Sequence, residues 1–172
     1  TFKVREETGE FLLTLSNQGE VLEKKPRFDI PSGFPKDLKL ISSVTAGTRT
    51  AHLGERNAKY YFVTEGETRG PYNDACLYSD GVNIHTTGVV LNDKKAYVVH
   101  DGKKGKEYDT IFTPLSVSPK GNHMAYLVRE GDRYAMVLDG EEGESFQDIS
   151  RPGVFNPDGR YLTYQAREGE KQ

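Results

Sequence analysis

Apolar and polar residues alternate over short stretches along this chain, and Gly or Pro interrupts almost every window of about a dozen residues. Glu10–Leu15 and Glu20–Glu23 flank the Gly-containing segment Ser16–Gly19, which predicts a β-hairpin. Leu38–Val44 alternates in the same way and predicts a further short strand. No segment sustains the 3.6-residue apolar period of a helix, so the pattern predicts an all-β protein.

The pattern repeats along the chain. Arg133–Glu170 aligns with Lys95–Asp132 at an offset of 38 residues without a gap, and a third copy begins at Lys59. The copies share an acidic residue before Gly (Glu65, Asp101, Asp139), a second Gly (Gly70, Gly105, Gly143), an aromatic residue (Tyr72, Tyr108, Phe146) and an apolar residue (Ala75, Ile111, Ile149). Agreement at four positions indicates a repeated structural unit.

Each copy is interpreted as four strands. One such set of strands is Leu115–Ser118, His123–Val128, Tyr134–Leu138 and a short strand around Phe146–Ile149. Pro-Lys-Gly or Pro-Asp-Gly joins the first two strands, and Asp-Gly joins the last two. Four short antiparallel strands in about 40 residues, repeated, are typical of a β-propeller blade.

Two related segments, Val154–Tyr164 and Ser116–Tyr126, resemble the hallmark phrase of the WD-repeat-like β-propellers of the TolB type. The similarity is good over residues 95–170, moderate over 57–94 and poor over 1–56. The earlier turns depart from the pattern, since Tyr78–Gly81 lacks Pro and Thr45–Gly47 lacks both Pro and Asp. The resemblance implies propeller blades, a role as an interaction platform and a periplasmic or secreted location.

The ends of the chain are predicted to share one blade. Tyr161–Arg167 ends the chain as a second strand, while Glu10–Leu15 and Glu20–Ile30 begin it as a third and a fourth. We therefore expect residues 1–172 to form a single propeller-like domain of about four blades. Two alternatives stay open: the chain is a segment of a larger propeller, or two copies complete one ring as a homodimer.

Composition narrows the function classes. The charged fraction is 28% and the net charge is −3, so there is no basic excess to favour nucleic acid. No apolar run is long enough to predict a membrane span. The single cysteine, Cys76, rules out an internal disulfide and is expected to be a buried structural residue.

Candidate chemistry is sparse. The four histidines, His52, His85, His100 and His123, lack close metal-ligand spacing. His100 and Asp101 are adjacent, and adjacent strand residues are expected on opposite faces. The serines Ser116, Ser118 and Ser150 lack the nucleophile-elbow context. The sequence therefore predicts no catalytic residue, no cofactor and no metal site.

Four cations lie in charged loops between second and third strands or between blades: Arg56, Lys94, Arg133 and Arg151. We expect them to surround one mouth of a central channel and to engage a carboxylated or protein partner; the alternative is a solvated rim. The predicted function is a non-enzymatic binding or scaffold module for a protein or peptide. The alternative function is a propeller hydrolase or the propeller part of a serine peptidase.

Overall fold

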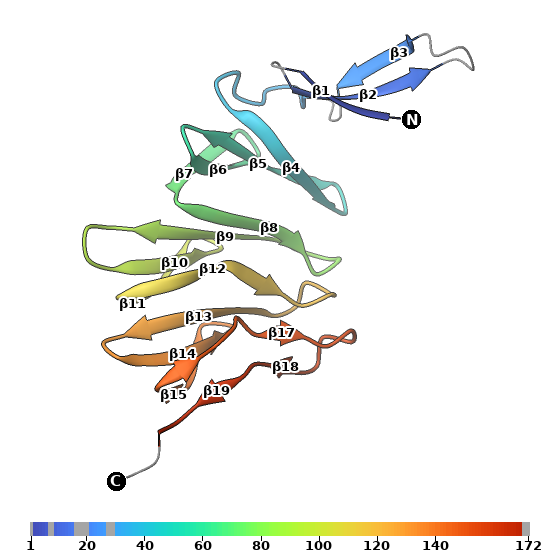
Figure 1. Cartoon of the computed structure of the whole chain (residues 1–172). Coiled ribbons are helices and arrows are strands. Elements are labelled where there is room, and N and C mark those ends of the chain that lie inside the picture. Colours follow the sequence, from blue (N-terminus) through green and yellow to red (C-terminus); the bar gives the residue numbers. More distant parts are fainter. Residues whose placement is uncertain (1, 7–8, 16–20, 27–29, 170–172) are drawn as a thin grey trace. The chain divides into compact units, whose positions relative to one another are not determined.

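The structure is a computed structural model that describes residues 2–6, 9–15, 21–26 and 30–169. The chain divides into two compact units, Thr1–Pro35 and Lys36–Gln172, and each is described by itself. All regular elements in the described ranges are β-strands, which confirms the predicted all-β class (Figure 1). In these ranges no helix has the length and apolar character needed to cross a membrane.

The first unit is a three-stranded antiparallel sheet. Its strands are β1 (Phe2–Glu6), β2 (Gly9–Leu15) and β3 (Val21–Pro26), in that order across the sheet. The predicted hairpin pairing of β2 with β3 is confirmed, while its turn, Ser16–Gly19, lies outside the described residues. The sequence interpretation missed β1, although Phe2 and Val4 alternate with charged residues there. The predicted pair of opening strands is thus a sheet of three.

The second unit contains three four-stranded antiparallel sheets that follow one another along the chain. The first sheet holds β4 (Lys39–Ala46), β5 (Arg49–Arg56), β6 (Lys59–Thr64) and β7 (Glu67–Tyr72). The second holds β8 (Asp74–Ser79), β9 (Ile84–Leu91), β10 (Ala96–His100) and β11 (Lys103–Tyr108). The third holds β12 (Thr110–Val117), β13 (Met124–Glu130), β14 (Arg133–Leu138) and β15 (Glu141–Phe146).

A two-stranded region follows the third sheet. β16 (Asp148–Ile149) pairs with β19 (Ala166–Arg167), and β17 (Val154–Phe155) pairs with β18 (Leu162–Thr163). By position in the repeat, these short strands are an interrupted first and second strand. The predicted second strand near the C-terminus is therefore present in two pieces.

The boundary between sheets differs from the sequence interpretation. The fourth strand follows the Asp-Gly turn at once, as β15 shows, and ends at the repeated aromatic residue Phe146. One residue later the next first strand begins, so Ile149 lies in β16 and Ile111 in β12. Placing Ile149 in a fourth strand was wrong, because a single residue suffices to pass from one sheet to the next.

Backbone geometry explains both repeated glycines. The acidic residue and the Gly of each third-to-fourth turn have positive φ, for example 47° at Asp101 and 79° at Gly102, as a two-residue hairpin turn requires. The second Gly lies opposite a register shift between the third and fourth strands. At Gly143 an added Cβ would lie 3.2 Å from the Met136 carbonyl oxygen. The backbones approach closely there, which disfavours larger residues.

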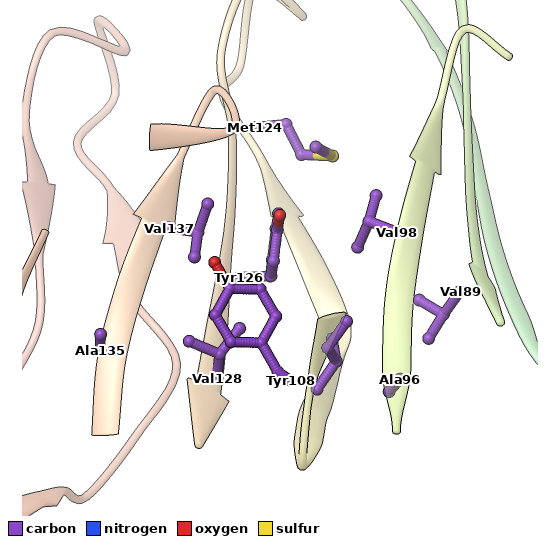
Figure 2. Packing of buried hydrophobic residues seen from close by; sticks show 10 residues of the cluster. Val89, Ala96, Val98, Tyr108, Met124, Tyr126, Val128, Ala135 and Val137 are labelled. Carbon is purple, nitrogen blue, oxygen red and sulfur yellow. The ribbon is translucent and has the colours of Figure 1, made fainter. Parts of the chain in front are cut away.

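Neighbouring sheets of the second unit pack face to face. Between the second and third sheets lies a cluster that includes Val89 and Val98 on one side and Tyr126 and Val137 on the other, with Tyr108 between them (Figure 2). The strand β13 packs on both faces: Met124, Tyr126 and Val128 face the second sheet, whereas Ala125 and Leu127 contact the C-terminal strands. This explains the continuous apolar run of β13, which would otherwise be expected to alternate.

No sheet of the described residues closes on itself, so the predicted propeller is not confirmed. β2 has partners on both sides, since Phe11 pairs with Val4 and with Pro26. The strand around Tyr164 pairs with β16 and β17 instead. Both edges of β2 are thus hydrogen-bonded within the first unit, and the blade shared by the two ends of the chain stays a prediction.

Removing one inward side chain tests the face-to-face packing. Leu127 is 4% exposed, so we expect Leu127→Ala to lower the free energy of unfolding by about 2–5 kcal/mol. Leu91→Ala is the matched control: Leu91 is 54% exposed, and we expect a change within about 0.5 kcal/mol. Urea denaturation followed by circular dichroism measures both, and equal losses would contradict the described packing.

Candidate functional site

The three complete sheets have two polar ends. One end carries the turns between first and second strands and between third and fourth strands; we call it the 1–2 end. The other carries the turns between second and third strands, and we call it the 2–3 end. In Figure 1 the turns between β9 and β10 and between β13 and β14 lie on the left, opposite the turns that precede β9 and β13.

Three of the four predicted cations lie at the 2–3 end, and two of the four are engaged. Arg56 forms an ion pair with Asp37, and its guanidinium lies 4.9 Å from the centre of the Tyr61 ring. Arg133 donates to Glu168 Oε1 at 2.8 Å. Lys94 lies in the β9–β10 turn, and Arg151 lies between β16 and β17. Both are exposed and form no hydrogen bond or ion pair with the described residues. The four side chains belong to four successive copies of the repeat, and their predicted place around the mouth of a channel stays a prediction.

An ion-pair seam joins the second and third sheets near the 2–3 end. Lys106 lies between Glu130 Oε2 at 2.9 Å and Glu142 Oε2 at 2.8 Å. Lys95 contacts Asp109 Oδ1 at 2.8 Å. Glu142 also accepts a hydrogen bond from the buried Tyr108 hydroxyl at 3.0 Å. The hydrogen bond from Lys106, ahead of that from Tyr108, holds the pKa of Glu142 below its ordinary value despite the opposing effect of burial.

At the 1–2 end, a basic residue at or next to the start of the second strand pairs with the acidic residue of the third-to-fourth turn. Arg49 Nε donates to Glu65 Oε1 at 3.0 Å in the first sheet. His85 Nδ1 lies 2.8 Å from Asp101 Oδ2 in the second, and His123 Nδ1 lies 2.7 Å from Asp139 Oδ2 in the third. We call these pairs the turn clips. Each spans 16 residues, and that common spacing is a signal the sequence interpretation overlooked.

The second sheet adds a further histidine to its turn clip. His100 Nε2 lies 3.5 Å from Asp101 Oδ2, and His100 Nδ1 lies 2.8 Å from Thr87 Oγ1. The His85 and His100 rings are nearly parallel, with centres 5.7 Å apart, and Tyr78 stacks on His85 at 5.2 Å. The expectation that His100 and Asp101 diverge was wrong, because φ of Asp101 is 47° and the strand ends before it.

Hydrogen bonding in this cluster favours the charged form of the Asp101 carboxylate and raises the pKa of His85. Burial by itself lowers the pKa of His85, but hydrogen bonds to Asp101 and Asp80 outweigh it, and the pKa lies above its ordinary value. Burial by itself raises the pKa of Asp101, but the hydrogen bonds from the Thr86 amide and from His85 hold it below its usual range. Burial raises the pKa of Tyr78 to about 12, so its hydroxyl stays protonated at neutral pH.

A polar cleft of about 360 Å³ opens between the first and second sheets at the 1–2 end. Asp101 and Thr86 line it from the second sheet, and Arg49, Glu65 and Arg69 line it from the first. Its arginines are engaged, since Arg69 donates to Glu67 at 2.9 Å and Arg49 to Glu65. The cleft therefore offers solvent access to Asp101 and no concentration of one charge.

Cys76 lies half-buried in β8 and is a free thiol. Burial, and then the nearby charge of Asp74, raises the pKa of the thiol. A thiol held in its protonated form is a poor nucleophile, which agrees with a structural role.

Comparison of the chain with protein-family models, with curated protein sequences and with solved structures gave no match.

The seam gives a testable pH effect. Glu142→Ala leaves the Tyr108 hydroxyl without its acceptor, and we expect a loss of about 1–2 kcal/mol of unfolding free energy at neutral pH. Because the pKa of Glu142 is lowered in the folded protein, its stabilisation is present above the ordinary value near 4.5 and disappears as pH falls through the lowered value. The difference in unfolding free energy between wild type and Glu142→Ala, measured by urea denaturation, should therefore shrink as the pH is lowered from neutral to below the lowered pKa.

The control is Glu144→Ala, which removes the same charge from the same strand, β15, where Glu144 has no hydrogen bond or ion pair to the described residues. We expect Glu144→Ala to change the unfolding free energy by less than about 0.5 kcal/mol, both at neutral pH and at acidic pH. Equal effects of the two substitutions would contradict a specific role for Glu142.

Proposed function

We propose that this chain is a non-enzymatic binding or scaffold module, built from propeller-type blades, that engages a protein or peptide partner through the turns of its 2–3 end and the loop between β16 and β17. The observation that carries this proposal is the contrast among the four cations. Arg56 and Arg133 are engaged with carboxylates of the chain itself, whereas Lys94 and Arg151 are exposed and without such a partner. Exposed cations on turns held by packed sheets suit recognition of an acidic partner.

The packing of the second unit supports a scaffold role. Side chains interdigitate between its sheets, so each turn at the 2–3 end is fixed by two strands whose inward residues are buried. Pre-positioned turns lose little conformational freedom on binding, which favours affinity. Strand order and repeat length agree with propeller blades, and the TolB-type resemblance supports an interaction platform in the bacterial envelope.

A hydrolase is less well supported. Thr87, His100 and Asp101 form a hydroxyl–imidazole–carboxylate series in the second sheet, the order of groups that activates a nucleophile. Thr87 is 0% exposed, however, so its hydroxyl cannot reach an external substrate. This series therefore favours a structural or ligand-binding role over acyl transfer.

The proposal is tested with fluorescent peptides of equal length that are acidic, neutral or basic, measured by anisotropy against the full chain. We expect the acidic peptide to bind preferentially and added salt to weaken it. Lys94→Ala/Arg151→Ala should weaken acidic-peptide binding about 3- to 10-fold, since each exposed contact contributes up to about 1 kcal/mol.

The matched control is Lys103→Ala/Lys120→Ala. It removes the same two charges from exposed positions in β11 and in the turn before β13, neither of which engages a described residue. We expect this control to bind as the wild type does. Equal weakening by both double variants would show a net-charge effect, and no preference for the acidic peptide would refute the proposed mode of binding.

A further inference from the structure

We propose that the second sheet carries a binding site for a borderline transition-metal ion of the Zn²⁺ type, with His85, His100 and Asp101 as its ligands. One ligand atom from each of the three residues lies within 4.8 Å of the other two. His85 lies near the start of β9, His100 is the last residue of β10, and Asp101 is in the turn that follows. The strands β9 and β10 are neighbours in the sheet. This site is independent of the peptide-binding surface proposed at the 2–3 end.

The spacing of the ligand atoms suits a tetrahedral ion. Zn²⁺ bonds nitrogen and oxygen at about 2.0–2.1 Å, which separates neighbouring ligand atoms in a tetrahedron by ~3.3 Å. Asp101 Oδ2 lies 2.8 Å from His85 Nδ1 and 3.5 Å from His100 Nε2. These two distances bracket the required value, and all three ligand atoms lie within 4.8 Å of one another, so side-chain movement would bring them to bonding distance of one ion. Two imidazoles and one carboxylate favour Zn²⁺ or Co²⁺ over Ca²⁺ or Mg²⁺, which prefer oxygen ligands.

Both histidines have a second partner that orients the ring. Asp80 Oδ2 lies 3.4 Å from His85 Nε2, on the side of the ring away from Asp101. Asp80 is itself fixed by hydrogen bonds from the amides of Val82 and Asn83. Thr87 Oγ1 lies 2.8 Å from His100 Nδ1. Carboxylate and hydroxyl partners of this kind hold metal-ligating imidazoles in one orientation and are a regular part of zinc sites.

The repeat itself distinguishes this site from a structural clip. The His85–Asp101 pair alone needs no metal to explain it, because the third sheet has the equivalent pair His123–Asp139. His100 and its partner Thr87 have no such precedent. At the paired positions where the second sheet has Thr87 and His100, the first sheet has Ala51 and Thr64, and the third has Ala125 and Leu138. The second sheet thus has the buried Thr87 hydroxyl and the His100 imidazole at positions where the other two sheets have no histidine.

The site is reachable and leaves a coordination position open. The side chains of His100 and Asp101 are 41% and 38% exposed, and that of His85 is 21% exposed. Asp101 also lines the polar cleft between the first and second sheets. A bound ion would complete a tetrahedron with water as its fourth ligand.

The experiment uses the full chain after treatment with a chelator. Zn²⁺ is titrated by calorimetry, and Co²⁺ is titrated by visible absorption, whose intensity reports a tetrahedral site. We expect one equivalent of either ion to bind the wild type and to raise its melting temperature. His100→Leu, which places the residue found in the third sheet, should weaken Zn²⁺ binding by more than about 10-fold and abolish the thermal shift.

His123→Ala is the matched control, because it removes a histidine from the equivalent clip that lacks a second imidazole. We expect it to retain binding within about 3-fold of the wild type. His100→Gln serves as a second variant if His100→Leu fails to fold, and it should also lose tetrahedral Co²⁺ absorption. The proposal is overturned by a wild type that shows no saturable binding, by retained binding in folded His100 variants, or by equal weakening in His123→Ala.

Discussion

Burial of both faces of a sheet by its neighbours is the constraint on which the second unit depends. No four-stranded sheet of this size can bury its two faces alone, and the strand β13 shows the result, with alternate residues contributing to two separate apolar clusters. The Tyr108 side chain, 1% exposed, closes the space between the second and third sheets. The polar ends of the sheets are free of this constraint, so residues there can differ between copies without disturbing the stack.

Two kinds of polar contact occur in the second unit, the turn clips within a sheet and the ion-pair seam between sheets. The turn clips recur in three sheets because each one closes a turn whose acidic residue has positive φ. The ion pairs of the seam join the second sheet to the third. In the second sheet the clip His85–Asp101 is extended by His100, a histidine that the other two sheets lack at this position. Departure from the repeat, more than the presence of histidine, marks it as a candidate site.

The sequence predicted the repeated elements well and their juxtaposition poorly. Alternation and the Asp-Gly turns located most strands, because side-chain period and φ preference are local properties. The end of a fourth strand could not be distinguished from the start of the next first strand, since one residue such as Asp109 connects them. The approach of His100 to Asp101 depends on where β10 ends, and His85 joins them through cross-strand pairing. Pairing between strands is a long-range property that residue spacing alone does not report.

The outer face of the C-terminal strands bears on how these sheets are arranged. At the repeat positions where β13 has Ala125 and Leu127, the C-terminal strands have Thr163 and Gln165, and both are exposed. Their inward neighbours Leu162 and Tyr164 still pack on the third sheet. A further sheet packed on that outer face would bury polar side chains that cost free energy unless hydrogen-bonded. The apolar pattern of the C-terminal strands thus favours burial of their inner face, where Leu162 and Tyr164 pack against the third sheet.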